Sequence, residues 1–500
     1  SRFRSHWMKG KIMESTAVRK IKLGETTSLC AVCKQGISAE IVEIDGRVFM
    51  EKSCGDHGNQ DVLIASDAGW YREVMSYPAA LVAPSRAKNE VDRGCPYDCG
   101  ACTSHQQKVY LPVVPITSAC NLDCPICYTI NKNEDAYNMS LEEFGDILDV
   151  VRQDDPELKI INFTGGEPTL HPELTQIIRM CHEAGIHRTT ISTHGLTFLR
   201  HEELLAELAE LDARIVLSFN SFEEDVNDKM IGANLLRSKL QVLDLLDKYD
   251  VDTTLIPVLA LGCNDEEVGK LVELALGREF IRSLEIHTMT FTGQGGLGFD
   301  PGARLTTPDV LRFIEETSGG NIRMSDFTPS PCAHPLCYQT CYLLETEKEG
   351  FIPFSRFMSR EQIRELLTDN LYIEPGAKME AILQDVVMEL WAREIPEAAD
   401  EAVLKAIKGL LERLFPSSPL DYRAQQRISE RSAKTIYIHS HMDDATFDTD
   451  RIRQCCVGVP DPEGGNIPTC SYNILYRGRD SRYSREELPL LDSYPNGKKW

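Results

Sequence analysis

The sequence predicts an α/β protein in which a region of alternating strands and helices is flanked on both sides by cysteine-bearing segments. Two observations lead to this fold class. Between residues 108 and 300, apolar strand-like runs alternate with amphipathic helix patterns such as HEELLAELAEL and NLLRSKLQVLDLLDKY. The chain also carries 17 cysteines in 500 residues, and most of them fall in short groups outside that region. The alternation favours a parallel sheet, and the cysteine groups indicate bound metal or iron–sulfur clusters.

Composition and charge fit a multidomain enzyme. Hydrophobic residues make up 42% of the chain and charged residues 26%, which supplies enough apolar material for a large core. The formal charge of −24 argues against a nucleic-acid partner, because phosphate binding requires clustered lysine and arginine. No apolar stretch approaches the ~20 residues of a membrane span, although peripheral membrane contact stays open. The basic run 1–11 is interpreted as a flexible arm or an expression remnant. We expect a cytoplasmic protein, since the motifs below need free thiolates.

We expect five segments along the chain. They are a metal-knuckle domain over residues 1–78, a cluster-bearing linker over 79–107, the alternating α/β region over 108–300, a cysteine loop and helical region over 301–436, and a cysteine-containing tail over 437–500. Periodic apolar runs in KMEAILQDVVMELWARE and EAVLKAIKGLLERLF predict the helices of the fourth segment. The tail returns to strand-like and turn-rich sequence, so the whole C-terminal part is predicted to be an α+β extension.

The first segment contains a mononuclear metal pattern. Cys30 and Cys33 form a CxxC pair, and Cys54 and His57 form a CxxH pair about twenty residues later. A hairpin-like stretch with an Asp-Gly turn at 45–46 separates the two pairs. This spacing is typical of a tetrahedral site for zinc or a single iron. The alternative is a surface hairpin with unliganded thiols.

Three further cysteine groups lie outside the α/β region. RGCPYDCGACTSH supplies Cys95, Cys99 and Cys102; SPCAHPLCYQTCYL supplies Cys332, Cys337 and Cys341; and the tail supplies Cys455, Cys456 and Cys470. Two fully liganded 4Fe-4S clusters would use eight thiolates, so these nine cysteines suffice for two auxiliary clusters, one of them completed by the tail. The spacing leaves the pairing open. Cys181 and Cys263 are interpreted as small hydrophobic residues.

The most specific pattern is CNLDCPIC, in which Cys120, Cys124 and Cys127 are spaced x3 and then x2 after a strand-like run over 109–116. Three thiolates in one loop can hold an iron–sulfur cluster and leave one iron without a protein ligand, where a substrate or cosubstrate can bind. A structural zinc knuckle is the alternative, but such sites usually close with four ligands in paired CxxC spacing.

A second motif, GGEP, follows the next predicted strand at 159–163. Gly165 and Gly166 allow a ligand to approach the backbone closely, and Glu167 offers a carboxylate to an amine at the strand end. Taken alone, GGEP is equally compatible with an ordinary strand-to-helix turn. Later strand-like runs cover residues 189–195, 214–224, 253–265 and 283–296.

Together, CxxxCxxC and GGE closely resemble the signatures of the radical S-adenosylmethionine (SAM) superfamily. In this chain Ile126 stands where that family has an aromatic residue, and Tyr128 follows the third cysteine instead. The resemblance implies a six-stranded partial (β/α)6 barrel over residues 108–300, with SAM chelating the open iron of a 4Fe-4S cluster. It assigns SAM contacts to Tyr128, Gly165, Gly166, Glu167, Ser192, Thr193, Ser218 and Asn220. The serine, threonine and asparagine residues could equally be N-cap or turn residues.

The order of all motifs, with GCPYDCG as the most specific part, resembles the tetraether lipid synthases of archaea and relatives once proposed to methylate a dihydropterin. That resemblance implies a rubredoxin-like mononuclear iron, two auxiliary clusters, an external one-electron donor such as flavodoxin or ferredoxin, and a 5'-deoxyadenosyl radical that takes hydrogen from an unactivated carbon. His57 departs from an all-cysteine rubredoxin and leaves iron or zinc open. We expect carbon–carbon coupling of lipid alkyl chains, with methylation or C–H functionalisation of a heterocycle as the alternative and an iron–sulfur electron carrier as a weaker one.

Overall fold

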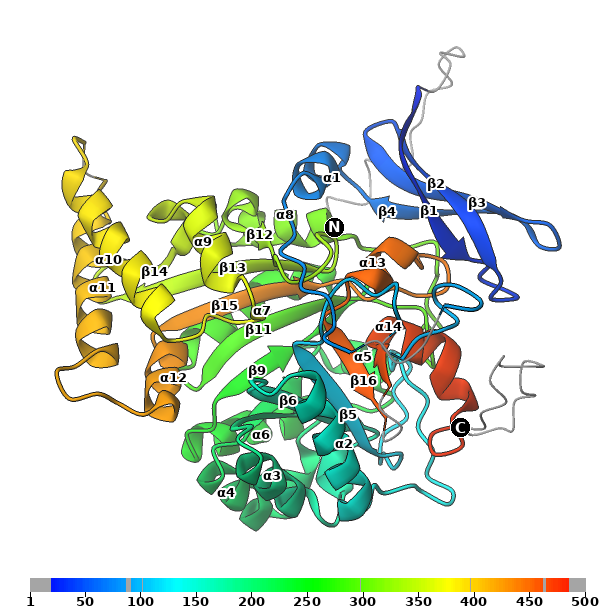
Figure 1. Cartoon of the computed structure of the whole chain (residues 1–500), viewed down its shortest axis with the longest axis horizontal. Helices are drawn as coiled ribbons and strands as arrows, with labels where there is room; N and C mark the ends of the chain where they lie inside the picture. The colour runs from blue at the N-terminus through cyan, green and yellow to red at the C-terminus, as the bar shows by residue number, and fades with distance from the viewer. Residues whose placement is uncertain are drawn as a thin grey trace.

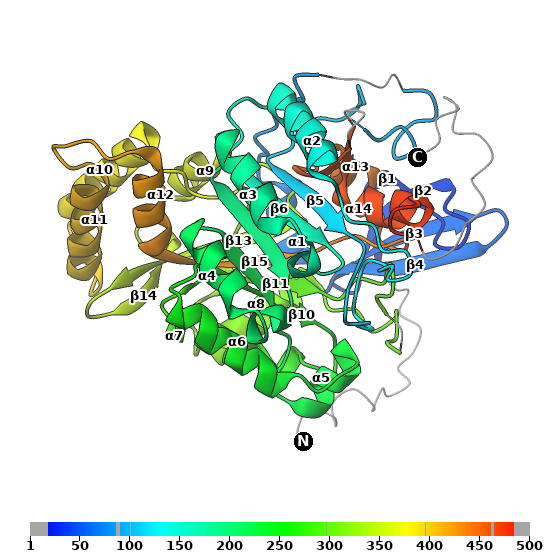
Figure 2. The ribbon, with the colours of Figure 1, turned by 90° about the horizontal axis from the view of Figure 1, so that it is seen from below.

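A computed structural model describes residues 19–86, 91–100, 102–296, 298–395, 397–461 and 465–484. The basic run 1–11 and the end of the tail beyond residue 484 lie outside these ranges. A small antiparallel sheet at the N-terminus and a cluster of helices from the C-terminal half lie at opposite ends of the molecule, with the main sheet between them (Figures 1 and 2).

The N-terminal sheet consists of four antiparallel strands in sequence order: β1 Lys20–Leu29, β2 Gly36–Ile44, β3 Arg47–Cys54 and β4 Gly58–Ala65, followed by α1 Ala68–Met75. Asp45 and Gly46 form the two-residue turn between β2 and β3, as predicted, and both have the positive φ (50° and 76°) that this hairpin turn requires. The turns β1–β2 and β3–β4 bring the CxxC and CxxH pairs to the same end of the sheet.

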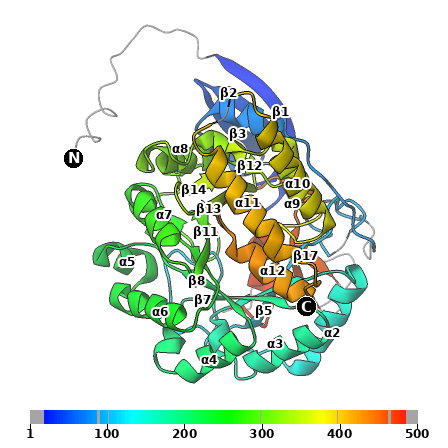
Figure 3. The ribbon, with the colours of Figure 1, turned by 90° about the vertical axis from the view of Figure 1, so that its left-hand side faces the viewer.

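The predicted alternation of strand and helix is confirmed in the middle of the chain. The parallel strands are β5 Leu111–Thr117, β6 Ile160–Gly165, β7 Arg188–Thr193, β8 Arg214–Ser218, β9 Thr253–Ile256 and β11 Ile281–Thr288, paired in that order. Their helices are α2 Leu141–Asp154, α3 Leu174–Glu183, α4 Glu202–Glu210, α5 Glu224–Ile231, α6 Leu236–Lys248, α7 Val268–Gly277 and α8 Thr307–Thr317. Figure 3 shows α2 to α7 in an arc outside the strands, the arrangement of a partial (β/α) barrel.

Local sequence explains where these elements begin. Ser140 caps α2 by accepting a hydrogen bond from the backbone of Glu143, whose side chain bonds back to Ser140 in a capping box. Thr306 and Asp309 form the same kind of box at the start of α8. Short loops then connect each helix to the next parallel strand, so all strand carboxyl ends meet at one end of the barrel, called the barrel mouth below.

Strands from the C-terminal half extend the sheet beyond both ends of the barrel. β15 Ala433–His439 pairs parallel with β11, and β13 Tyr338–Thr346 pairs antiparallel with β15 and carries β12 Thr328–Pro329 and β14 Gly350–Pro353. At the other end, β16 Val457–Pro460 pairs parallel with β5 and antiparallel with β17 Asn466–Pro468; the two-residue β10 Val258–Leu259 pairs with β11. The remaining helices are α9 Arg360–Leu367, α10 Ala377–Ala392, α11 Asp400–Leu414, α12 Tyr422–Arg431, α13 Thr449–Arg453 and α14 Thr469–Ser471.

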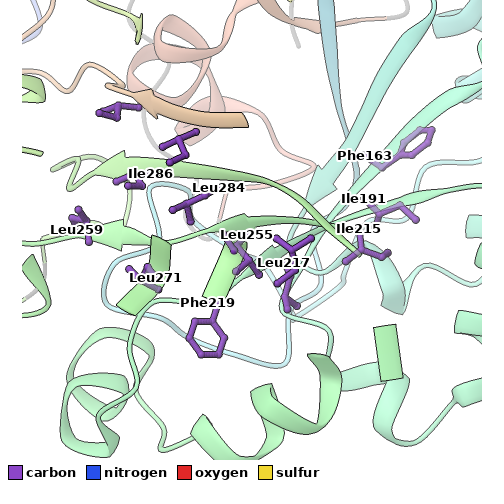
Figure 4. Packing of buried hydrophobic residues seen from close by; sticks show 14 of the residues in the cluster. Phe163, Ile191, Ile215, Leu217, Phe219, Leu255, Leu259, Leu271, Leu284 and Ile286 are labelled. Carbon is purple, nitrogen blue, oxygen red and sulfur yellow. The ribbon is translucent and has the colours of Figure 1, made fainter. Parts of the chain in front are cut away.

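One apolar core lies between the parallel strands and their outer helices. Figure 4 shows inward residues of successive strands, such as Ile191, Ile215, Leu255 and Leu284, stacked across the sheet; all four are fully buried. The same cluster continues into the N-terminal sheet through residues such as Val48. A second cluster holds α9, α10 and α11 against β13 and β14. Among the described residues, no helix has the length and apolar character needed to cross a membrane.

Candidate active site

The loop after β5 presents the predicted cluster cysteines at the barrel mouth. The backbone N–H of Cys120 donates to Asn133 Oδ1 (2.8 Å), and the N–H of Cys127 donates to the Cys124 carbonyl (3.0 Å), which folds the loop into a compact turn. Burial, with the neighbouring thiols adding to the effect, raises the pKa of Cys120 and of Cys124 to about 12. Three thiols packed closely enough to influence one another are a donor set that fits an iron–sulfur cluster with one free iron position.

Gly165 and Gly166 hold this loop against β6. The N–H of Gly166 donates to the Thr117 carbonyl (2.8 Å), and the N–H of Glu167 donates to the Ala119 carbonyl (2.7 Å). A Cβ atom on Gly165 would lie 2.1 Å from the Thr117 oxygen, and one on Gly166 would lie 2.0 Å from the Ala119 oxygen. The glycines are therefore required for the close approach of two protein backbones.

The Glu167 carboxylate is buried and organises the turns after β6 and β7. Its Oε1 accepts from Thr169 Oγ1 (2.6 Å) and Thr193 Oγ1 (2.5 Å), and its Oε2 accepts from the N–H of His194 (2.9 Å). It also interacts electrostatically with Cys120. Glu167 and Thr193 thus lie together beside the cluster loop, as the resemblance implies, and their contact with SAM stays a prediction.

Lys239 is a buried cation that the sequence reasoning missed. It is 2% exposed on α6, and its Nζ donates to the carbonyls of His194 and Ser218 (both 2.7 Å) and to Ser218 Oγ (2.9 Å). Burial lowers its pKa to about 8, against the attraction of Glu167 and Cys124. The signal was present in the sequence, because Lys239 occupies the apolar face of its helix, three and four residues before the core positions 242 and 243.

The other residues assigned to SAM are placed at the barrel mouth and engaged within the protein. Ser192 Oγ donates to Asn162 Oδ1 (3.2 Å), and Asn220 Oδ1 accepts from the N–H of Val258 (2.9 Å). Tyr128 is half-buried and stacks on His441 with ring centroids 5.3 Å apart. These contacts are those of turn and packing residues, so direct SAM contact stays a prediction for each of them.

A polar wall closes the barrel mouth on the side of β11 and β15. His287 and His439 are paired in the parallel register of these two strands, and His441 follows two residues later. Glu285, on the same face of β11 as His287, accepts hydrogen bonds from His287 Nε2 (3.0 Å) and His439 Nδ1 (3.3 Å). Sequence reasoning missed all four residues, although a histidine at the end of each of two strand-like runs was a visible signal.

The mononuclear set of the N-terminal sheet is brought together as predicted. Cys30, Cys33, Cys54 and His57 each offer one donor atom within 4.8 Å of the others. Burial opposes ionisation of Cys30, but hydrogen bonds from the Cys33 backbone and the Gln60 amide lower its pKa to about 6. Four nitrogen and sulfur donors, supplied by two turns, fit a metal ion with tetrahedral coordination.

The linker cysteines form a separate group. Cys95, Cys99 and Cys102 line a small hollow together with His105 and Arg453. Burial raises the pKa of Cys95 to about 12, and it also holds the pKa of Cys99 well above its ordinary value. Within the described residues, no fourth cysteine lines this hollow, so the group offers three thiolates.

A second cysteine group outside the barrel is assembled from two distant segments. Five cysteines approach one another because β16 lies beside β5 and the 332–337 loop packs over them: Cys332, Cys337, Cys455, Cys456 and Cys470. Arg451 lies beside them and donates to Cys337 Sγ (3.6 Å) and to the Ser440 carbonyl (2.6 Å). His105 Nε2 donates to the Cys455 carbonyl (3.0 Å), so the two groups are neighbours.

The expectation that Cys341 belongs to a cluster is not supported by its position. Cys341 lies inside β13, 1% exposed, in the apolar core, and its neighbouring charged groups are Asp326 and Arg356. Cys341 lies four residues along the chain from Cys337, inside the extended strand, and a rise of about 3.3 Å per residue puts roughly 13 Å between the two positions.

Comparison with known proteins agrees with this geometry. Residues 114–275, from β5 to α7, match the family model of the radical SAM superfamily. The chain is a radical SAM enzyme. SAM and the radical SAM 4Fe-4S cluster are therefore its cofactors, with Cys120, Cys124 and Cys127 as the thiolates available at the mouth of the matched domain. Residues 22–66 match the HMPTM N-terminal zinc ribbon domain, which covers the four-ligand site of the small sheet.

This radical SAM enzyme is similar in sequence to several known proteins. It is 28% identical over 480 residues to 7,8-dihydro-6-hydroxymethylpterin dimethyltransferase of Methanocaldococcus jannaschii, covering 91% of this chain and 94% of that protein. It is 29% identical over 257 residues to a probable GTP 3',8-cyclase of Saccharolobus islandicus, covering 47% of this chain and 79% of that one. Among solved structures, methylornithine synthase (13% identical, TM-score 0.34) covers 59% of this chain and 86% of that chain. At that TM-score the structural likeness decides nothing further.

Proposed function

We propose that this radical SAM enzyme methylates, or otherwise functionalises a C–H bond of, a small pterin-like heterocycle. The observation that carries the proposal is the alignment with the archaeal dihydropterin dimethyltransferase, which extends over 91% of this chain and 94% of that protein. The polar wall of Glu285 and the three histidines adds support, since a nitrogen- and oxygen-rich ring can form hydrogen bonds there and an alkyl chain cannot.

Different residues at the barrel mouth would bind the cluster, position the loops and orient the substrate. When bound, SAM and the reduced cluster supply a radical that abstracts hydrogen from an unactivated carbon. Cys120, Cys124 and Cys127 would hold the cluster, while Glu167 and Lys239 keep the turns after β6, β7 and β8 in place beside it. The polar wall would orient the substrate ring at the barrel mouth.

We assign auxiliary clusters to the two remaining cysteine groups. The linker group of Cys95, Cys99 and Cys102 would hold one, and Cys337, Cys455 and Cys470, with Cys332 or Cys456, would hold the other. Storage of a carbon radical or electron relay to the radical SAM cluster are the roles available to them, and an external flavodoxin or ferredoxin would supply electrons. For the ribbon site, the match to a zinc ribbon favours zinc over iron.

Lipid chain coupling, which the motif order predicted, is the alternative that the test must distinguish from pterin methylation. The full-length protein with reconstituted clusters is incubated anaerobically with SAM, a reductant and either 7,8-dihydro-6-hydroxymethylpterin or a phospholipid extract. The proposal expects 5'-deoxyadenosine together with a pterin heavier by one or two methyl groups in mass spectra. Unchanged pterin, with two lipid chains joined at the cost of two hydrogens, would overturn it in favour of coupling.

Two cysteine variants make the assay specific. Cys124→Ala should abolish SAM cleavage, because the cluster loses one of its thiolates. Cys341→Ala is the matched control: a buried thiol outside every cysteine group should leave iron content and product formation within about twofold of the wild type. Loss of iron from the Cys341 variant would instead show that Cys341 is a cluster ligand.

A further inference from the structure

Three histidines converge at the polar wall, outside the proposed cysteine ligand sets. His287 and His439 come from paired positions at the ends of β11 and β15, and His441 lies two residues beyond. One ring nitrogen of each lies within 4.8 Å of one ring nitrogen of each of the others. A single histidine at a strand end is commonly a packing residue, but three with ring nitrogens this close together could hold a metal ion.

A carboxylate behind the histidines fixes their orientation. Glu285 accepts an N–H from His287 Nε2 (3.0 Å) and an N–H from His439 Nδ1 (3.3 Å) at the same oxygen. Donation through these atoms leaves His287 Nδ1 and His439 Nε2 as acceptors, the form in which imidazole binds a metal ion. Metal-bound histidines usually donate their second N–H to a carboxylate in this way.

The rings are also held by packing while the site stays accessible. Tyr338 stacks on His439 with centroids 3.9 Å apart, and Tyr128 stacks on His441 at 5.3 Å. The side chains of His287 and His439 nevertheless keep 13% and 10% of their surface exposed, so the cluster lines the barrel mouth and is not sealed in the core.

Charged and polar side chains surround the three histidines. Arg451 is the nearby cation, and its guanidinium is engaged by Cys337 Sγ and the Ser440 carbonyl. Cys470 Sγ lies 3.7 Å from His441 Nδ1, so the three-histidine set borders the second cysteine group at His441. The carboxylate of Glu285 supplies negative charge beside His287 and His439.

We propose that His287, His439 and His441 form a further mononuclear site, distinct from the zinc ribbon and the cysteine groups, for a divalent transition-metal ion such as Zn²⁺ or Fe²⁺. Three neutral imidazoles suit these ions, and a site with three protein ligands keeps a coordination position open. Tyr128, the residue after Cys127, stacks on His441, so a substrate nitrogen or oxygen on the ion would lie near the radical SAM loop. This substrate-anchoring role rests on the proposed function, whereas metal binding does not.

Cobalt binding to the full-length protein tests the site. The protein with reconstituted clusters in the Cys54→Ser background, which removes the ribbon site, is titrated anaerobically with Co²⁺ alone. Bound cobalt is counted by elemental analysis, and its high-spin signal is recorded by electron paramagnetic resonance while the oxidised clusters are silent. We expect one cobalt per chain with nitrogen ligation, and none after His439→Gln/His441→Gln.

Two more variants make the result decisive. His182→Gln/His187→Gln changes another close histidine pair, with rings 5.3 Å apart on the outer surface of the barrel, and should bind cobalt like its parent. Glu285→Gln should weaken cobalt binding by about 10- to 100-fold, because it removes the carboxylate behind two ligands. Equal cobalt binding by the parent and the His439/His441 variant, at equal iron and sulfide content, would overturn the metal site.

Adding substrate tests the substrate-anchoring role of the ion separately from metal binding itself. If 7,8-dihydro-6-hydroxymethylpterin shifts the cobalt signal, the ion contacts the substrate as proposed. If the signal stays unchanged while pterin is methylated, the anchoring role is wrong. If cobalt binds but no pterin is methylated, the proposed function falls and the metal site stands.

Discussion

Lys239 and Glu167 are buried charges of opposite sign beside the cluster loop, and both act through the strand ends they hold. Glu167 binds the turns after β6 and β7, and Lys239 joins the ends of β7 and β8 through His194 and Ser218. At the residue scale, the site is therefore built by side chains that fix loop geometry as much as by those that would touch a cofactor.

Lys239→Met should impair both stability and SAM use. An apolar chain leaves the acceptors of His194 and Ser218 without their common donor and Glu167 without its nearby cation, so we expect destabilisation of about 3 kcal/mol or more. The two strand ends that border the cluster loop are then no longer held together. We expect the KM for SAM to rise, or the rate of 5'-deoxyadenosine release to fall, by about 10-fold or more. Lys248→Met, an exposed change on the same helix, is the control and should match the wild type. Equal kinetics for both variants would leave Lys239 a purely structural residue.

His171 should make stability fall at acid pH. It is buried; its Nε2 donates to the Met139 carbonyl (2.9 Å), and its Nδ1 accepts from the N–H of Glu173 (3.1 Å), so both nitrogens are used by the neutral ring. Burial lowers its pKa below the ordinary 6.5. The folded state therefore binds fewer protons than the unfolded state below pH 6.5, and the stability that neutral His171 provides is lost as the pH falls through its lowered value.

The measurement compares unfolding free energies from urea titrations between pH 7.5 and 5.5. The advantage of the wild type over His171→Gln should shrink by up to about 1 kcal/mol as the pH drops. His201→Gln replaces an exposed histidine and serves as reference. An advantage that stays constant with pH would mean that His171 contributes only through packing.

At the element scale, the close contact between β6 and the cluster loop is the feature that sets the geometry of the mouth. The backbones of residues 117–119 and 165–167 exchange hydrogen bonds at 2.7 and 2.8 Å, which leaves no room for a side chain on either glycine. Packing of two protein segments therefore accounts for the GG pair of the motif, while the close approach of SAM to the same glycines stays a prediction.

Gly166→Ala should displace the cluster loop. Its Cβ would meet the Ala119 carbonyl at 2.0 Å, and a backbone atom cannot move aside cheaply. We expect destabilisation of about 2 kcal/mol or more and a clear loss of iron per chain after reconstitution. Gly409→Ala, inside α11 with open space around the new methyl group, is the control and should stabilise the protein by about 0.5–1 kcal/mol. Full iron content in the Gly166 variant would show that the loop can yield.

At the scale of the whole molecule, segments that lie far apart in the sequence contribute to the same sheet and to the same group of cysteines. The chain beyond α12 supplies β15 and β16 at opposite ends of the parallel sheet, and its cysteines lie beside the 332–337 loop. The zinc ribbon sheet is tied to the same tail, since Lys52 Nζ donates to the Leu29 carbonyl (2.7 Å) within the sheet and to the Ala445 carbonyl (2.6 Å) in the tail. Its apolar residues also join the barrel core.

Removing the ribbon metal should therefore destabilise more than the ribbon. Cys33→Ser takes away one ligand of the four-residue set. Because the ribbon core is continuous with the barrel core, we expect a lower Tm for the main calorimetric transition, by on the order of 5 °C, and not only local melting. A separate low-temperature transition with an unchanged main Tm would show that the ribbon folds on its own.

Local pattern by itself determined a large part of this protein. The alternation of strand and helix predicted the parallel barrel, the Asp-Gly turn predicted the first hairpin, and short spacings predicted the CxxxCxxC loop and the CxxC/CxxH set, because each of these depends on neighbours within a few residues or one repeating unit. Tertiary structure alone decided which of the remaining cysteines lie close together, the position of Cys341 in the apolar core, the burial of Lys239 near Glu167, and the meeting of His287 with His439 across residues 288–438. Those contacts arise from the order of strands in a sheet, which spacing along the chain does not encode.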